Sequence, residues 1–112
     1  MTFIKNITTG IADAELVAAY KRDGDMEVLS NLYQRYMDLV YGVCLKYFEN
    51  SDDAKDAVIN IFEELVVKVR KYEIEHFKAW LYQLARNHCL MKLRSEKNKP
   101  RAVVYDFMYL EE

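Results

Sequence analysis

Residues 52–69 read DDAKDAVINIFEELVVKV, and this stretch decides the fold class. Its apolar residues Ala57, Ile61 and Leu65 recur every four positions, and acidic residues occupy many of the positions between them. This spacing is typical of an α-helix with one buried face. The Leu-Val-Val run near its end favours a strand locally, but the longer repeat outweighs it. We therefore predict a helix here, followed by a polar connector over residues 70–75.

Three more helices are predicted around this one, over residues 13–22, 26–48 and 76–96. In the long helix at 26–48, apolar residues repeat at spacings of three and four. Acidic and hydroxyl side chains at helix starts hydrogen-bond the free N–H groups of the first turn. The residues expected at these starts are Asp13, Asp25 and Ser51.

The composition agrees with a helical fold. The 112 residues are 52% hydrophobic and include three Gly and one Pro, too few turn-forming residues for a many-stranded β fold. We predict an all-α protein, a compact bundle of about four helices. The expected organisation is a loose lead-in at residues 1–12, a helical domain at 13–97 and an apolar tail at 98–112.

The helix predicted at 76–96 has one apolar stripe, on which Trp80 is expected to be at least partly buried. His88 lies on this stripe and is expected to be a core histidine, whereas His76 is expected at the surface. The stripe consists of Phe77, Trp80, Leu81, Leu84, Ala85, His88 and Met91.

The net charge of −2 conceals two segments of opposite sign. Residues 49–64 contain six acids and one lysine, a net charge of −5. Residues 68–101 contain ten bases and three acids, a net charge of +7. Such a chain can meet a basic partner with one surface and a polyanion with another.

No pattern for catalysis or metal binding is present. The two histidines lack metal-ligand spacing, and the glycines do not form a phosphate-binding loop. We therefore expect no enzymatic activity and no cofactor. Cys44 and Cys89 fit buried reduced thiols, although a disulfide between them is also compatible with the sequence. The longest uncharged apolar run, residues 39–45, is too short to span a bilayer, so we expect a cytoplasmic protein.

Cations alternate with aromatic and imidazole rings in the basic segment. Lysine and arginine bind phosphates, and aromatic rings stack on unpaired bases, so this surface suits single-stranded nucleic acid. Its residues are Lys71, Tyr72, His76, Lys78, Tyr82, Arg86, Arg94 and Lys97.

The helix at 52–69 offers a second surface. Its acidic side chains would meet a basic partner, and Ile59 or Phe62 would supply an apolar anchor for that contact. The polar residues of this surface are Asp52, Asp53, Asp56, Asn60, Glu63 and Glu64.

Two motifs in this order, DDAKDAVINIFEEL (residues 52–65) and FKAWLYQLARN (residues 77–87), resemble region 2 of bacterial sigma factors. The group that they resemble most is the extracytoplasmic-function (ECF) sigma factors. The upstream segment ELVAAYKRDGDMEVLSNLYQRYMDLVYGVC is similar to the opening helix, turn and long second helix of that class. The resemblance extends over residues 13–97.

The resemblance implies a transcription initiation factor domain. Such a domain binds core RNA polymerase through the clamp helices of the largest subunit, recognises the promoter −10 element and holds the melted non-template strand. By motif position, the polymerase-binding residues would be Asp53, Asp56, Ile59, Asn60, Phe62 and Glu63. The DNA-binding residues would be Lys71, Tyr72, His76, Lys78, Trp80, Tyr82, Arg86, Asn87, Arg94 and Lys97, with a strand-capturing loop at 71–77. An anti-sigma factor is a further partner that the resemblance implies.

The chain departs from the family pattern at several positions. Ile59 and Asn60 stand where Gln-Glu is frequent, Val66 where Trp is common and Met91 where Asp is common. Nothing in the chain resembles region 4, so the tail at 98–112 is expected to be the start of a linker to that missing domain. The alternative function is a sigma-like helical protein-interaction module without promoter binding.

Overall fold

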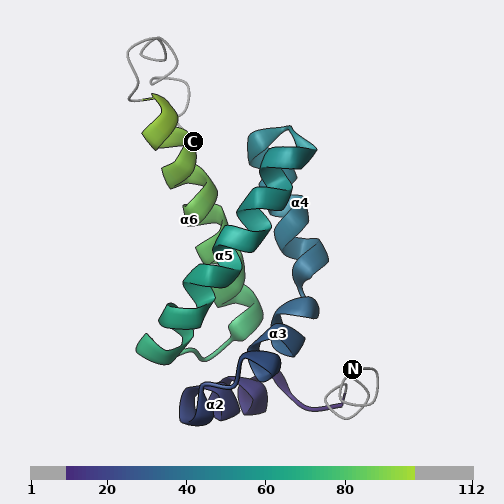
Figure 1. Ribbon diagram of the computed structural model, residues 1–112, viewed down its shortest axis with the longest axis vertical. Helices are drawn as coiled ribbons and strands as arrows, with labels where there is room; N and C mark the ends of the chain where they lie inside the picture. The colour runs from purple at the N-terminus through teal and green to yellow at the C-terminus, as the bar shows by residue number, and fades with distance from the viewer. Residues whose placement is uncertain (1–9, 98–112) are drawn as a thin grey trace.

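The computed structural model describes residues 10–97, which form five α-helices around one hydrophobic core (Figure 1). The expected lead-in at 1–12 and tail at 98–112 lie outside these residues, except for positions 10–12. The described chain is all-helical, as predicted, but it has five helices where about four were expected. They are α2 (Asp13–Asp23), α3 (Met26–Gln34), α4 (Met37–Phe48), α5 (Ser51–Lys71) and α6 (Phe77–Lys97).

The extra helix arises because the predicted helix at 26–48 breaks at Arg35 and Tyr36. Their backbone N–H groups bond to carbonyl oxygens three residues earlier, at 3.2 and 3.0 Å, and Tyr36 has φ −123° and ψ 13°. This tight turn brings both side chains to Asp13 on α2. The Asp13 carboxylate accepts a hydrogen bond from Arg35 Nη1 at 2.8 Å and another from the Tyr36 hydroxyl.

Asp13 therefore does not cap α2, as we had expected. The residue before the helix is Ala12, which makes no side-chain cap, and the Asp13 carboxylate is directed to Arg35 and Tyr36 instead. The cap expected at Asp25 is confirmed, since its side chain accepts from Glu27 N–H at 2.9 Å. At α5 the cap is Asn50, whose side chain accepts from Asp53 N–H at 3.0 Å, and not Ser51.

The junction between α2 and α3 requires a glycine. Gly24 ends α2 with φ 68° and ψ 24°, in the left-handed region where a side chain is disfavoured. A Cβ atom at this position would also lie 2.7 Å from Arg70 Nη1. The end of α2 thus packs directly beside the end of α5.

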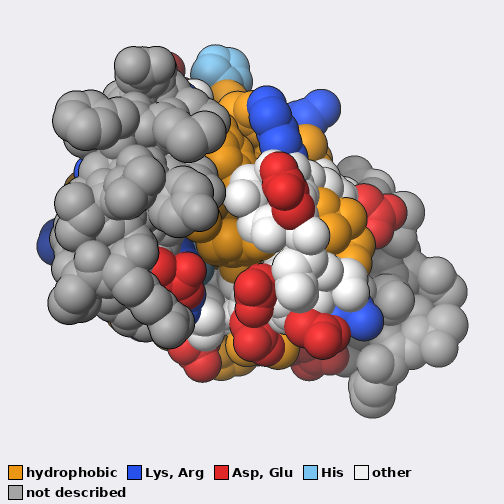
Figure 2. All heavy atoms as spheres, turned by 90° about the horizontal axis from the view of Figure 1, so that it is seen from above, with side chains coloured by type: hydrophobic (Ala, Val, Ile, Leu, Met, Phe, Trp, Pro, Cys, Tyr) orange, Lys and Arg blue, Asp and Glu red, His pale blue; other side chains and the backbone are white. Residues whose placement is uncertain are grey.

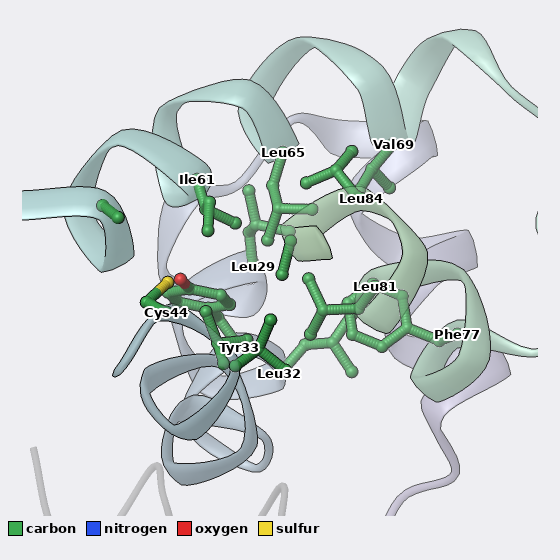
Figure 3. Packing of buried hydrophobic residues seen from close by; sticks show 14 of the residues in the cluster. Leu29, Leu32, Tyr33, Cys44, Ile61, Leu65, Val69, Phe77, Leu81 and Leu84 are labelled. Atoms are coloured by element: carbon green, nitrogen blue, oxygen red, sulfur yellow. The ribbon is translucent and has the colours of Figure 1, made fainter. Parts of the chain in front are cut away.

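The core runs along α5, whose residues Ile61, Leu65 and Val69 are fully buried at successive turns. Figure 3 shows these side chains pointing from α5 toward Leu29 and Leu81, which belong to α3 and α6. The helical repeat that favoured α5 over a strand is therefore the repeat that builds the core.

The apolar stripe of α6 is buried only along its first part. Trp80 is half-buried, as expected, and its ring centroid lies 6.1 Å from that of Phe77. Met91, which we expected on the buried stripe, is 65% exposed. Figure 1 shows why: α6 crosses α5, and its C-terminal turns extend away from it. Met91 lines an open pocket beside Glu64 and Lys68 of α5 instead of being packed in the core.

The two cysteines join α4 to α6 without a disulfide. Cys44 and Cys89 are fully buried and free, and their Sγ atoms lie 3.7 Å apart in a thiol–thiol contact. The hydrogen bond to Cys44, together with burial, raises the pKa of Cys89. The free state of both buried cysteines agrees with the reduced thiols that we predicted.

No helix within residues 10–97 has the length and hydropathy needed to cross a membrane.

Candidate functional site

The acidic residues predicted on α5 share one exposed side of that helix. Asp53, Asp56, Asn60 and Glu63 are all exposed, and Ile59 among them is 60% exposed. Phe62 is half-buried. Figure 2, which views the end of the molecule where α4 meets α5, shows acidic side chains gathered on one part of the face, with hydrophobic side chains between them.

Helical geometry orders this surface around Ile59. At 3.6 residues per turn, Asp56 and Glu63 lie on one side of Ile59, and Phe62 lies on the other. We call Asp56, Asn60 and Glu63 the acidic row. Ile59 therefore separates the acidic row from a hydrophobic area that begins at Phe62.

Glu64 does not belong to the acidic surface, although we had expected it there. Its Oε1 atom accepts a hydrogen bond from Lys68 Nζ at 2.8 Å, and its Oε2 atom lies 2.5 Å from His88 Nδ1 on α6. Burial acts to raise the pKa of Glu64, but the hydrogen bonds and charges of Lys68 and His88 outweigh it, so the pKa lies below its ordinary value. Through these bonds Glu64 connects α5 to α6.

His88 is half-buried on α6, close to what we expected of a core histidine. Its Nδ1 atom faces Glu64, and its buried Nε2 atom has no hydrogen-bond partner among the described residues. Within the part of the chain that the structure describes, no three His, Cys, Asp or Glu side chains are arranged to hold a metal ion.

An apolar pocket of about 270 Å³ adjoins Ile59 and Phe62. The sequence did not indicate this pocket, because α5 supplies only part of its wall. We call it the α3–α5 pocket; it is lined by Ser30, Tyr33, Gln34, Met37, Val58, Ile59 and Phe62. The signal available in the sequence was Met37, an apolar residue outside the buried repeat of its segment, which is 38% exposed.

The predicted DNA-binding residues around the junction of α5 and α6 lie on the connector at residues 72–76 and on the helix ends beside it. Lys71, Tyr72, His76 and Lys78 are all exposed. The Lys71 Nζ atom lies 5.6 Å from the centroid of the Tyr72 ring. A cation beside an open aromatic face is an arrangement that suits a phosphate and its neighbouring base.

Helix α2 holds this connector in place, which the sequence did not indicate. Lys21 Nζ donates to the carbonyl oxygen of Tyr72 at 2.8 Å, and Arg70 Nη2 donates to the carbonyl oxygen of Lys21 at 3.2 Å. These two bonds are reciprocal contacts between the ends of α2 and α5. They fix the backbone from which the Tyr72 ring projects.

The predicted DNA-binding residues of α6 form two rows rather than one. Residues four positions apart along α6 form the first row, on one side of its exposed face. Residues seven positions apart form the second row, on the other side. Tyr82, Asn87 and Arg94 are exposed, whereas Trp80 and Arg86 are half-buried. The side chain of Lys97 lies outside the described part of the structure. The first row is Lys78, Tyr82 and Arg86, and the second is Trp80, Asn87 and Arg94.

A second pocket, of about 440 Å³, lies between α5 and α6 beside the second row. It contains the amide of Asn87 and two lysines, Lys68 and Lys92. Glu64, Leu84, His88 and Met91 complete its wall. The pocket joins hydrogen-bonding, cationic and apolar groups in one place.

Known proteins with similar sequences are sigma factors. The chain is 26% identical over 77 residues to the ECF RNA polymerase sigma factor SigW of Bacillus subtilis (strain 168), covering 68% of this chain and 41% of that protein. It is 28% identical over 71 residues to SigM of the same organism, also an ECF RNA polymerase sigma factor, covering 63% of this chain and 44% of that protein. The chain thus spans less than half the length of these relatives. No solved structure matches it significantly.

The family model for Sigma-70 region 2 matches residues 32–99, which is more than half of the chain. The matched range contains α4, α5 and α6, which carry most of both charged surfaces. The motifs at 52–65 and 77–87, on which the resemblance was recognised, both lie inside it. This chain therefore belongs to the Sigma-70 region 2 family, a domain of transcription initiation factors and not of enzymes.

Proposed function

We propose that this domain recruits core RNA polymerase through the exposed side of α5 and binds the melted −10 element of promoters through the connector and α6. The observation that carries this proposal is the separation of exposed acidic and basic residues around one core. Asp53, Asp56 and Glu63 are exposed within the first two thirds of α5, while Lys71 at the C-terminal end of α5 and Lys78 and Arg94 on α6 are also exposed. A basic protein surface and a polyanion can then bind at the same time without competing.

The polymerase contact is proposed for Asp53, Asp56, Ile59, Asn60, Phe62 and Glu63. Carboxylates at the edge steer a basic partner, and Ile59 and Phe62 supply the apolar centre. The clamp helices of the largest polymerase subunit are the proposed partner, and an anti-sigma factor that covers the same side would inhibit recruitment.

The DNA contact is proposed for the connector and both rows of α6. Lysines and arginines bind phosphates of the displaced strand, and the Tyr72 and Tyr82 rings stack on its bases. The pocket beside Asn87 has the amide and cationic groups to hold a base that has left the stack. Each stacked or pocketed base offsets the few kcal/mol that unstacking costs.

Reversing two charges of the acidic row tests the polymerase contact. Asp56→Lys with Glu63→Lys is expected to weaken binding to core RNA polymerase by about tenfold or more, because attraction to a basic surface becomes repulsion. Both residues are exposed, so the fold should survive. The measurement is a titration of labelled domain with purified core enzyme.

The matched control is Glu15→Lys with Asp23→Lys, which makes the same change in net charge on α2, at two exposed positions. It is expected to leave the affinity within about twofold of wild type, since long-range charge alone is largely screened at physiological salt. Equal losses in the two double variants would contradict a specific contact at α5.

Removing one cation from each row of α6 tests the DNA contact. Arg86→Ala with Arg94→Ala is expected to weaken binding to a single-stranded −10 oligonucleotide, and to lower the slope of log K against log salt by about 1.4, the value for two phosphate contacts. Fluorescence anisotropy at several salt concentrations gives both quantities. An unchanged affinity and slope would show that α6 is not the DNA surface.

The alternative, a sigma-like interaction module without promoter binding, has one observation in its favour. Glu73 and Glu75 are exposed in the connector, beside Tyr72 and His76, where they repel a phosphate backbone. This function predicts normal partner binding and no measurable affinity of the wild-type chain for the oligonucleotide. The same anisotropy titration therefore distinguishes the two functions.

A further inference from the structure

We infer that the α3–α5 pocket anchors one apolar side chain of a basic helix of RNA polymerase, inserted beside Ile59. The inference rests on the proposed function, because it specifies how the partner of the α5 surface binds. It adds α3 and the start of α4 to an interface so far confined to α5.

The floor of the pocket is already built in the free protein. Tyr33 is buried, and its hydroxyl donates to the carbonyl oxygen of Val58 at 2.7 Å. The centroid of the Phe62 ring lies 5.3 Å from that of Tyr33. These contacts hold both rings against α5, so a ligand side chain does not have to order them.

The mouth of the pocket is formed by two exposed apolar side chains, Met37 and Ile59, from different helices. A methionine adapts its shape to an incoming group, and an isoleucine presents a rigid branched surface. The volume of about 270 Å³ lies just below the roughly 300–1,000 Å³ typical of sites for drug-sized ligands. The pocket therefore suits one or two side chains of a protein partner.

Charge around the pocket selects the kind of partner. The acidic row lies on the far side of Ile59, and two further exposed carboxylates belong to Glu27, one helical turn before Ser30, and to Asp38, the residue after Met37. The exposed Lys55, one turn before Ile59, offsets only part of this negative charge. A helix carrying one large apolar residue flanked by Lys or Arg is complementary to this surface.

The same charges argue against two other occupants. Nucleic acid would bring phosphates against the carboxylates. A second copy of this chain, related by a two-fold axis at the pocket, would bring the acidic row close to itself. A basic protein helix meets neither difficulty.

Substitutions at the mouth test the inference. Ile59→Gln is expected to weaken binding to core RNA polymerase by about tenfold, and Met37→Gln by a smaller factor, because buried apolar anchors dominate interface affinity. Val67→Gln is the matched control, since Val67 lies on the same helix, is 63% exposed and does not line the pocket. Ile59→Leu keeps the apolar surface and is expected to retain affinity.

Salt dependence separates the anchor from the charges. Loss of an apolar anchor should weaken binding by a similar factor at about 0.1 and about 0.5 M salt, because apolar burial is not screened. Reversal of Asp56 and Glu63 should instead change the slope of affinity against salt. The titrations use the wild-type chain and each variant with purified core enzyme.

The outcomes are distinguishable. If Ile59→Gln and Met37→Gln behave like Val67→Gln while charge reversal still weakens binding, the anchor is overturned, together with the role of Ile59, and recruitment of polymerase through the acidic residues of α5 stands. If Ile59→Gln abolishes self-association in sedimentation but leaves polymerase affinity unchanged, the occupant is a second copy and the inference is overturned. If wild-type chain does not bind core enzyme, the proposed function fails and the inference fails with it.

Discussion

Leu65→Ala is expected to lower the free energy of unfolding by about 2–5 kcal/mol, the range for truncating a large aliphatic side chain in a packed core. Leu65 is fully buried at the middle of α5, between Ile61 and Val69 on the same buried face. Figure 3 shows Leu65 pointing into the core toward Leu29 of α3, so the cavity would open inside the core. Urea unfolding followed by circular dichroism measures the change.

The control for Leu65→Ala is Val67→Ala on the same helix. Val67 is exposed, so this variant removes methyl groups without opening a cavity, and its cost should stay within about 0.5 kcal/mol. Equal costs for the two variants would mean that the buried face of α5 is not where the structure places it.

Asp13→Ala is expected to lower the free energy of unfolding by about 2 kcal/mol, because it removes two hydrogen bonds to a charged carboxylate. These bonds hold Arg35 and Tyr36 at the turn between α3 and α4. The side chains of Asp13 and Arg35, which form the ion pair, are each only 24% exposed. Tyr36→Phe removes one of the bonds and should cost about half as much. Thermal or urea unfolding of the three proteins gives the comparison.

A spectroscopic readout ties this loss to the turn itself. The hydrogen bond that the Tyr36 hydroxyl donates to Asp13 is the main cause that raises its pKa above the ordinary value for tyrosine. In Asp13→Ala this tyrosine should therefore ionise at lower pH. Glu15→Ala, an exposed residue in the same helical turn, is the control and should change neither property. A cost in Asp13→Ala no greater than in Glu15→Ala would contradict the role of the turn.

Much of the fold could be predicted because its causes are local. The repeat of Ala57, Ile61 and Leu65 predicted α5 and its buried face, and the carboxylate of Asp25 predicted the start of α3. Helical periodicity and N-terminal capping act between residues two to four positions apart, and the sequence displays such relations directly. The same periodicity placed Asp56 and Glu63 on the exposed side of α5.

Two of the errors, at Asp13 and Glu64, occurred where a side chain had two plausible partners, one nearby and one distant in the sequence. Asp13 was expected to cap its own helix but bonds to Arg35 and Tyr36. Glu64 was expected to face a partner but bonds to His88, 24 positions away. In each case a partly buried charge is stabilised best by the group that packing brings to it, which local spacing does not reveal.

The sequence by itself determined the helical class, the separation of acidic and basic segments and the relation to sigma factors. These properties depend on composition, short-range periodicity and residue order. Only the tertiary structure decided the turn at residues 35–36, the link between Glu64 and His88, the anchoring of the connector by Lys21 and the α3–α5 pocket. Each of these requires side chains from separate helices to meet, and their meeting is set by burial of a shared core rather than by any spacing along the chain.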